Sequence, residues 1–190
     1  MIDLDKEYDY YINNESMDGM PISVETAKFM YYLCNQCKFK TLMDRGSGFS
    51  SFILRLYASE QDFPVDVFSI DTDPDWIEKT KAYLDLRNLN TDNFYIWDDF
   101  YRNRKDIRFD FILEDAKFEL RITTYNQFIK LINADGVILW DDANHNSHKP
   151  IILSCAKELG FKVIDIKNLT VDKFGRCSTL TTNRQIDLGV

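Results

Sequence analysis

Short apolar runs alternate with amphipathic stretches along most of the chain. Residues 65–71 (VDVFSID) place apolar side chains at alternate positions, a periodicity typical of a β-strand. Similar runs recur before and after this one, and together they predict seven strands. The predicted strands cover residues 41–44, 65–71, 93–97, 109–115, 136–142, 161–166 and 177–182.

The stretches between these strands have the spacing of amphipathic helices. Ser23 is a suitable N-cap for the first helix, Asp73 followed by Pro74 opens a later one, and Gly160 ends the last. The predicted helices cover residues 23–37, 49–58, 75–86, 125–133 and 148–159. Strands interleaved with helices predict a doubly wound α/β fold, with a seven-stranded, mostly parallel sheet, helices on both faces and an antiparallel last strand.

The chain has 190 residues and shows no repeat, low-complexity tract or linker. We therefore expect residues 1–190 to form a single domain. Residues 1–20 are rich in Asp, Glu, Asn and Tyr and lack clear periodicity. We expect this segment to be either a lid over the binding site or a loose tail.

Composition narrows the range of partners. Hydrophobic residues make up 45% and charged residues 28% of the chain, as in a globular protein, and no stretch approaches the roughly 18 apolar residues of a membrane span. The first residues are acidic and polar rather than basic and then apolar, so we expect a cytoplasmic protein. The net charge of -8 and the scattered lysines and arginines make nucleic acid an unfavourable partner.

A turn with two glycines joins the first predicted strand to its helix, in the stretch 44–51 (DRGSGFSS). Gly46 and Gly48 can adopt a positive φ or let a ligand approach the backbone, and Ser50 and Ser51 can cap the helix. A helix N-terminus offers free N–H donors to an anionic or polar ligand. The alternative is a tight turn with a good cap and no ligand.

Acidic residues stand at the carboxyl end of each of the first five predicted strands. In a doubly wound sheet these ends border the ligand crevice, so the acids would form a mouth rich in hydrogen-bond acceptors. Asp71 lies after the second strand, where a nucleotide-binding unit places an acid on the ribose hydroxyls, although a solvated turn acid is the alternative. The acids are Asp44, Asp71, Asp98, Asp99, Glu114, Asp115, Asp141 and Asp142.

With these motifs the chain resembles the class I S-adenosylmethionine-dependent methyltransferases, over residues 41–140. The stretch 44–51 is similar to the first motif of that family, 69–81 to the second and 109–116 to the fourth. The resemblance implies the Rossmann-like methyltransferase fold and S-adenosyl-L-methionine as cofactor. The cofactor-binding residues that we assign on these motifs are Asp44, Gly46, Ser47, Gly48, Ser50, Ser51, Asp71, Thr72, Asp98, Asp99 and Glu114.

In that family Asp71 would bind the ribose, and Asp98 or Asp99 the adenine amino group. Asp44 and the backbone of residues 46–48 would surround the methionine portion. Arg45 departs from the family pattern, because a small or apolar residue is common after the first acid. We also find no full G-x-G-x-x-G motif, which the nicotinamide-dependent dehydrogenases favour.

The acceptor side would lie beside the stretches EDAKFE (114–119) and WDDANHNSH (140–148). We assign Asp115, Asp142 and His145 as catalytic candidates, since a base assists transfer to a hydroxyl. Lys117, Asn144 and His148 are further candidates. A divalent metal on Asp115, Asp142 and Asn144, as in the catechol-type enzymes, is an alternative that we do not favour, because the spacing of the acids departs from that pattern.

The sequence thus predicts a methyltransferase that acts on a small or medium-sized acceptor molecule at oxygen or nitrogen. A cofactor-binding subunit or sensor without turnover, and another nucleotide-dependent enzyme such as a dehydrogenase, are the alternatives.

Overall fold

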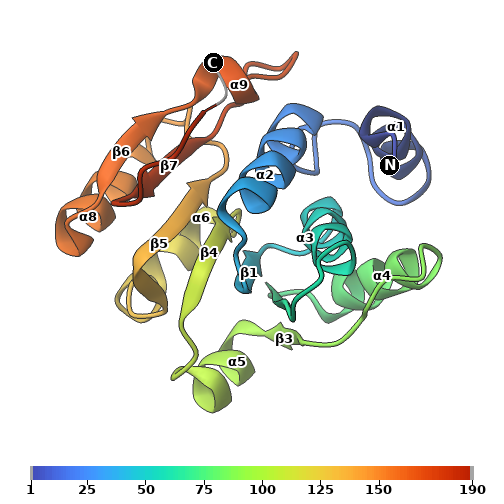
Figure 1. Cartoon of the computed structure of the whole chain (residues 1–190), viewed down its shortest axis with the longest axis horizontal. Helices are drawn as coiled ribbons and strands as arrows, with labels where there is room; N and C mark the ends of the chain where they lie inside the picture. Colours follow the sequence, from blue (N-terminus) through green and yellow to red (C-terminus); the bar gives the residue numbers. More distant parts are fainter. Residues whose placement is uncertain (1, 189–190) are drawn as a thin grey trace.

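The computed structural model describes residues 2–188 and has one mixed sheet between two layers of helices (Figure 1). The strand order is β3-β2-β1-β4-β5-β7-β6. All neighbouring strands are parallel except β7, which is antiparallel to both β5 and β6. The strands are β1 (Thr41–Arg45), β2 (Asp66–Asp71), β3 (Phe94–Ile96), β4 (Phe109–Glu114), β5 (Ile132–Trp140), β6 (Lys162–Asp165) and β7 (Thr179–Thr182).

The sheet confirms the predicted fold class, including the antiparallel strand near the end of the chain. Strand order reverses between β1 and β4, so the carboxyl end of β1 lies at the topological switch point. The nine helices of the described chain are α1 (Leu4–Asn14), α2 (Val24–Cys37), α3 (Phe49–Ser59), α4 (Pro74–Asp85), α5 (Trp97–Arg104), α6 (Phe118–Thr123), α7 (Tyr125–Phe128), α8 (Lys149–Leu159) and α9 (Lys167–Thr170).

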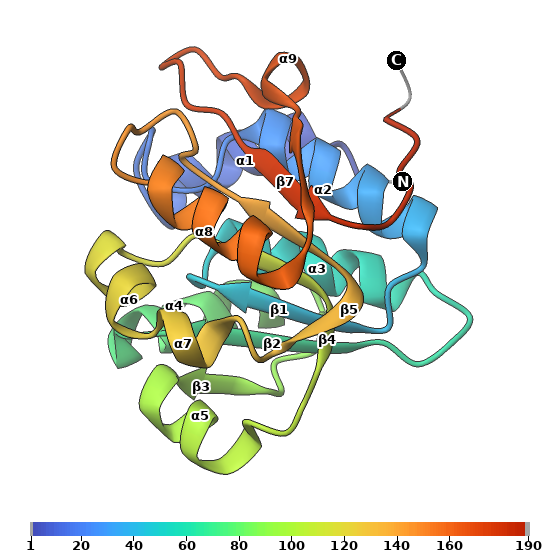
Figure 2. The ribbon, with the colours of Figure 1, turned by 90° about the vertical axis from the view of Figure 1, so that its left-hand side faces the viewer.

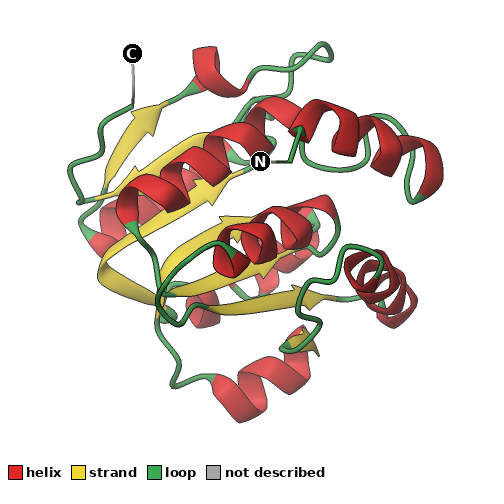
Figure 3. Cartoon of the chain, turned by 45° about the vertical axis from the view of Figure 1, so that its right-hand side comes forward, coloured by secondary structure: helices red, strands yellow, loops and turns green. Residues whose placement is uncertain are grey.

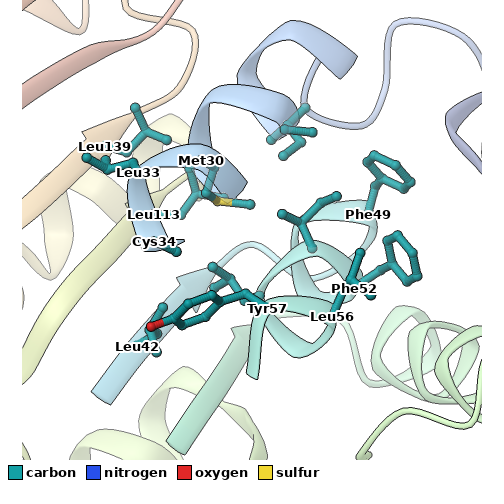
Figure 4. Close-up of a cluster of buried hydrophobic side chains, with 14 of the residues drawn as sticks. Met30, Leu33, Cys34, Leu42, Phe49, Phe52, Leu56, Tyr57, Leu113 and Leu139 are labelled. Atoms are coloured by element: carbon teal, nitrogen blue, oxygen red, sulfur yellow. The ribbon is translucent and has the colours of Figure 1, made fainter. Parts of the chain in front are cut away.

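Side chains of successive strand residues enter two different hydrophobic clusters. Leu42 of β1 and Leu113 of β4 pack with α1, α2 and α3, whereas Met43 and Ile112 pack on the opposite face with α5, α7 and α8. In Figure 2, α6, α7 and α8 lie in front of the sheet, with α2 and α3 behind it. Figure 4 shows the first cluster, where Tyr57 of α3 lies beside Leu42. Burial on both faces explains why the central strands are continuous apolar runs.

The helix predicted over residues 125–133 is wrong in its second half. Helix α7 stops at Phe128, and β5 already begins at Ile132, which pairs with Phe109. The N–H of Phe109 donates to the carbonyl of Leu131 at 2.8 Å. Pairing with a neighbouring strand therefore overrides the local helical pattern of this stretch.

The amino-terminal segment contains a helix that the sequence did not predict. Helix α1 starts after the N-cap Asp3 and packs Tyr8 and Tyr11 against Phe49 of α3. A loop then leads to the N-cap Ser23 of α2 (Figure 3). Helices α5, α6 and α9 were also not predicted.

Candidate functional site

A pocket of about 300 Å³ opens at the carboxyl ends of β1 and β2. Its walls come from the turn after β1, the end of β2, the start of α4, the residues after β4, and the amino-terminal segment. The lining residues are Tyr11, Met20, Pro21, Ile22, Gly46, Ser47, Gly48, Phe49, Ser50, Ile70, Asp71, Thr72, Asp73, Trp76, Asp115, Ala116, Lys117 and Leu120.

The glycine turn borders this pocket and needs both glycines. Gly46 has φ +119° and Gly48 has φ +141°, values that residues with a Cβ rarely adopt. A Cβ on Gly46 would lie 2.7 Å from the carbonyl oxygen of Asp115, and one on Gly48 would lie 3.0 Å from the Tyr11 hydroxyl. Because the chain's own atoms already lie where each Cβ would be, the glycines let the turn pack closely against Asp115 and Tyr11 at the edge of the pocket.

Asp44 lies beneath the turn and does not line the pocket. Its carboxylate is fully buried and accepts hydrogen bonds from the hydroxyls of Ser51 and Ser69. One carboxylate oxygen, Oδ1, has no hydrogen-bond partner within the described chain. Burial raises the pKa of Asp44 to about 7, while the hydrogen bond from Ser51 opposes that shift. Asp44 thus fixes the start of α3, with Ser51 as the link.

Asp71 lines the pocket and binds the glycine turn directly. Its Oδ2 accepts from both the N–H and the hydroxyl of Ser47, each at 2.9 Å. Its Oδ1 accepts from the N–H groups of Thr72 and Asp73, at 2.7 and 3.1 Å. A bound hydroxyl would replace the Ser47 hydroxyl most readily, because that donor alone sits on a rotatable side chain. Thr72 also lines the pocket, as does Ser50, whose hydroxyl donates to the carbonyl of Gly46.

Trp76 is a lining residue that the sequence analysis missed. It follows Asp73, which caps α4, and its indole N–H donates to the carbonyl of Ser47 at 2.7 Å. Ser47 is thus held on two sides, with its N–H bonded to Asp71 and its carbonyl oxygen bonded to Trp76. The signal available in the sequence was the position of Trp76 in the first turn of the helix that follows Asp71.

Five of the assigned cofactor residues do not line the pocket: Asp44, described above, and Ser51, Asp98, Asp99 and Glu114. Glu114 is fully buried, and its Oε2 accepts from Arg45 at 2.7 Å. This pair explains Arg45, whose guanidinium also lies 4.2 Å from the centre of the Trp97 ring. Asp98 and Asp99 are exposed on α5. Because these five residues lie outside the lining, we assign no cofactor contact to their side chains.

An acid cluster lies beside the pocket, at the ends of β4 and β5. Carboxylate oxygens of Asp115, Asp141 and Asp142 all lie within 4.8 Å of one another. Burial and the neighbouring acids raise the pKa of Asp141 to about 6 and the pKa of Asp115 well above its usual value. Arg121 offsets part of this charge, with its Nη2 3.7 Å from Asp115 Oδ1. The Arg176 guanidinium also interacts electrostatically with Asp141 and Asp142. Three carboxylates thus lie near two guanidinium groups, so the cluster is electrostatically suited to a further cation.

The cluster fits a divalent metal in its donor types, but not in the residue set that the sequence suggested. All its donors are carboxylate oxygens, the ligands that magnesium and calcium prefer, and Asp142 Oδ1 is buried without a hydrogen-bond partner in the described chain. Asn144 instead accepts from the N–H of Cys177 at 3.4 Å, and Asp141 takes its place in the cluster.

A second cavity of about 290 Å³ adjoins the first and shares Asp115, Ala116 and Lys117 with it. Asp142 and His145 line this cavity, so it brings the three catalytic candidates together. The remaining lining residues are Phe118, Arg121, Ser147 and His148.

His148 is a mostly buried residue of this cavity, whereas His145 is exposed. The ring of His148 lies stacked on Phe118, and its Nδ1 lies 3.0 Å from the carbonyl oxygen of Asp142. Burial, together with the nearby Arg121 guanidinium, lowers the pKa of His148. Of the two histidines, His145 is therefore the one free to meet an acceptor.

Comparison with solved structures gives matches over nearly the whole chain. Cofactor-bound Rv0187 from MTB aligns with a TM-score of 0.74 at 17% identity, over 96% of this chain and 90% of that one. The O-methyltransferase TomG from Streptomyces achromogenes, in complex with SAM, aligns with a TM-score of 0.70 at 16% identity, over 96% and 90%. This chain has the class I methyltransferase fold.

A third structure of this fold, the O-methyltransferase from Bacillus cereus in complex with SAH, aligns with a TM-score of 0.68 at 15% identity, over 94% of this chain and 88% of that one. No protein-family model and no curated protein sequence matches the chain. Among the described residues, no helix is both long and apolar enough to cross a bilayer.

Proposed function

We propose that this protein is an S-adenosylmethionine-dependent methyltransferase that acts on a small or medium-sized molecule at oxygen or nitrogen. The observation that carries this proposal is the pair of adjoining cavities, which share the stretch 115–117. The glycine turn and Asp71 line one cavity, and Asp115 and Asp142 of the acid cluster line the other. Methyl transfer needs this arrangement, because donor and acceptor must meet at one boundary.

In the first cavity, the chain's own residues would bind and orient the cofactor. Asp71 would accept hydrogen bonds from the ribose hydroxyls, as the second-strand acid does in nucleotide-binding folds. Gly46, Ser47 and Gly48 line this cavity, so the backbone of the turn would border the ligand. Bound S-adenosylmethionine would supply an activated methyl group, so that orientation of the acceptor provides much of the rate.

In the second cavity, the acceptor would lie near Asp115, Asp142 and His145. His145 is exposed and could take the proton of an acceptor hydroxyl. If a divalent cation binds, Asp115, Asp141 and Asp142 would hold it, and it would polarise an acceptor oxygen as a Lewis acid. Comparable solved structures are named as O-methyltransferases, which favours oxygen as the methylated atom.

Calorimetric titration of the protein with S-adenosylhomocysteine and, separately, with NAD tests the cofactor. We expect binding of the former and none of the latter. Binding of NAD alone would reject the proposal in favour of a dehydrogenase. Transfer of a labelled methyl group to small phenols and amines then tests turnover, since a cofactor-binding subunit would bind S-adenosylhomocysteine without transferring label.

A further inference from the structure

The wall of the cofactor pocket formed by residues 20–22 is tied to a loop near the far end of the chain. Arg176 lies in the loop between α9 and β7, and its Nη1 donates to the carbonyl oxygens of Gly19 at 2.8 Å and Pro21 at 3.0 Å. These two carbonyls flank Met20, which lines the pocket. In Figure 1 this loop lies at the top of the view, near the start of α2.

The orientation of Arg176 is itself fixed by its own loop. Its Nε donates to Asp172 Oδ2 at 2.7 Å, and its side chain is 16% exposed. Asp172 Oδ1 accepts from the N–H groups of Phe174 and Arg176, which closes the loop on itself. The guanidinium therefore meets the two carbonyls without having to be ordered by them. Charge-assisted bonds of this kind are stronger than bonds between neutral groups.

Few other polar contacts hold residues 17–21. The Lys173 ammonium pairs with Asp18, but both side chains are substantially exposed, at 66% and 42%, so this pair contributes little. Met17 and Met20 are exposed, and the Met20 N–H donates to the Met17 carbonyl within the segment. The position of the wall thus depends mainly on Arg176 and on the buried side chain of Ile22.

We propose that Arg176 is a positioning residue for cofactor binding, because it holds Met20, Pro21 and Ile22 as one wall of the pocket without itself lining it. This inference rests on the proposed cofactor. Residues 19–22 and the loop around Arg176 would then have to come together before the pocket is complete.

The test compares Arg176→Met, which keeps the aliphatic stem, with Arg176→Lys, which keeps a charged donor. Lys173→Met is the matched control, since it removes a cation of the same loop that contacts the same segment. For each variant, hydrogen exchange without ligand reports on residues 17–22, and calorimetry gives the Kd for S-adenosylhomocysteine.

For Arg176→Met we expect about tenfold weaker binding of S-adenosylhomocysteine, the loss typical of one charge-assisted hydrogen bond. Faster exchange should be confined to residues 17–22, and Arg176→Lys should recover part of the affinity. Lys173→Met should change Kd less than about twofold. In an assay of methyl transfer, KM for the cofactor should rise in Arg176→Met. In Arg176→Lys, which keeps a positive charge near Asp141 and Asp142, kcat should change little.

Unchanged Kd in Arg176→Met together with faster exchange of residues 17–22 would overturn the inference, because the wall would then be loose without consequence. Faster exchange throughout the chain, without recovery in Arg176→Lys, would assign Arg176 a general structural role instead. If the unmodified protein does not bind S-adenosylhomocysteine, the proposed function fails, whereas the exchange data still report whether Arg176 holds the segment.

Discussion

The carboxylate of Asp71 accepts two hydrogen bonds from Ser47, which joins the end of β2 to the glycine turn after β1. Because Asp71 also accepts from the N–H groups of Thr72 and Asp73, one side chain organises both turns that border the pocket. The residue proposed to bind the ribose therefore also builds its own site. Substitutions at Asp71 should affect both the turn and the ligand.

Asp71→Ala should weaken binding of S-adenosylhomocysteine by about 2–4 kcal/mol, through loss of hydrogen bonds to a charged acceptor. Calorimetry measures this change in Kd. Asp75→Ala is the matched control, because Asp75 is an exposed acid of the same region that does not line the pocket. Equal affinities of the two variants would leave Asp71 with a role in the turn alone.

Gly46→Ala should destabilise the protein by more than about 2 kcal/mol, from backbone strain and from contact with the Asp115 carbonyl. Gly160→Ala separates the two causes, since Gly160 has φ +67° but nothing lies within 4 Å of an added Cβ. Strain alone should cost Gly160→Ala about 1–2 kcal/mol. Urea denaturation measures both, and a smaller cost for Gly46→Ala would show that the turn can move away from Asp115.

Arg45→Met should cost about 3–5 kcal/mol, because it leaves the buried Glu114 carboxylate without its closest partner. Adding Glu114→Gln should recover much of that loss, since the uncompensated charge is then removed. Arg102→Met, at an exposed pair with Asp99, should change the free energy of unfolding by less than about 1 kcal/mol. Additive costs at Arg45 and Glu114 would contradict a coupled pair.

The pKa of Asp44, about 7 in the folded protein, predicts how the stability of the protein changes with pH. In the unfolded chain its pKa returns to near 3.8, so between pH 4 and pH 7 the folded state binds more protons. The contribution of Asp44 to the free energy of unfolding is therefore fully present below pH 4. It is lost as the pH rises toward 7, by at most about 1.4 kcal/mol per pH unit.

Asp44→Asn removes this titration, and its amide oxygen can still accept from Ser51. Urea unfolding at pH 5, 6 and 7 should give a shallower fall of stability with pH in this variant than in the unmodified protein. Equal slopes would mean that the buried carboxylate is ionised throughout the range.

Much of the fold could be predicted from the sequence, because the alternation of strands and helices is local and strong. The predictions that went wrong depend on contacts between distant segments. Pairing with β4 extends β5 back to Ile132, and α1 gains its stability from burying Tyr8 and Tyr11 against Phe49. Neither contact has a signal in the local pattern.

At the site, the sequence identified the residues that stand directly in turns. Gly46, Ser47, Gly48 and Asp71 line the pocket, since a strand end and a helix start fix their positions. Glu114 shows the limit of this reasoning. Successive residues at a strand end point to opposite sides, so Asp115 faces the pocket while Glu114 is buried under Arg45.

Magnesium should raise the melting temperature of the protein. A ligand that binds only the folded state adds RT ln(1 + [L]/Kd) to the free energy of unfolding, which is about 2.7 kcal/mol when the free ligand is at a hundredfold excess over Kd. The acid cluster provides the reason, since three carboxylates lie close together near the two guanidinium groups of Arg121 and Arg176. Asp142→Asn should abolish the shift, while Asp62→Asn, at an exposed acid before β2, should retain it. A shift that survives in Asp142→Asn would place the cation elsewhere, and its absence from the unmodified protein would leave methyl transfer to Asp115, Asp142 and His145 without a metal.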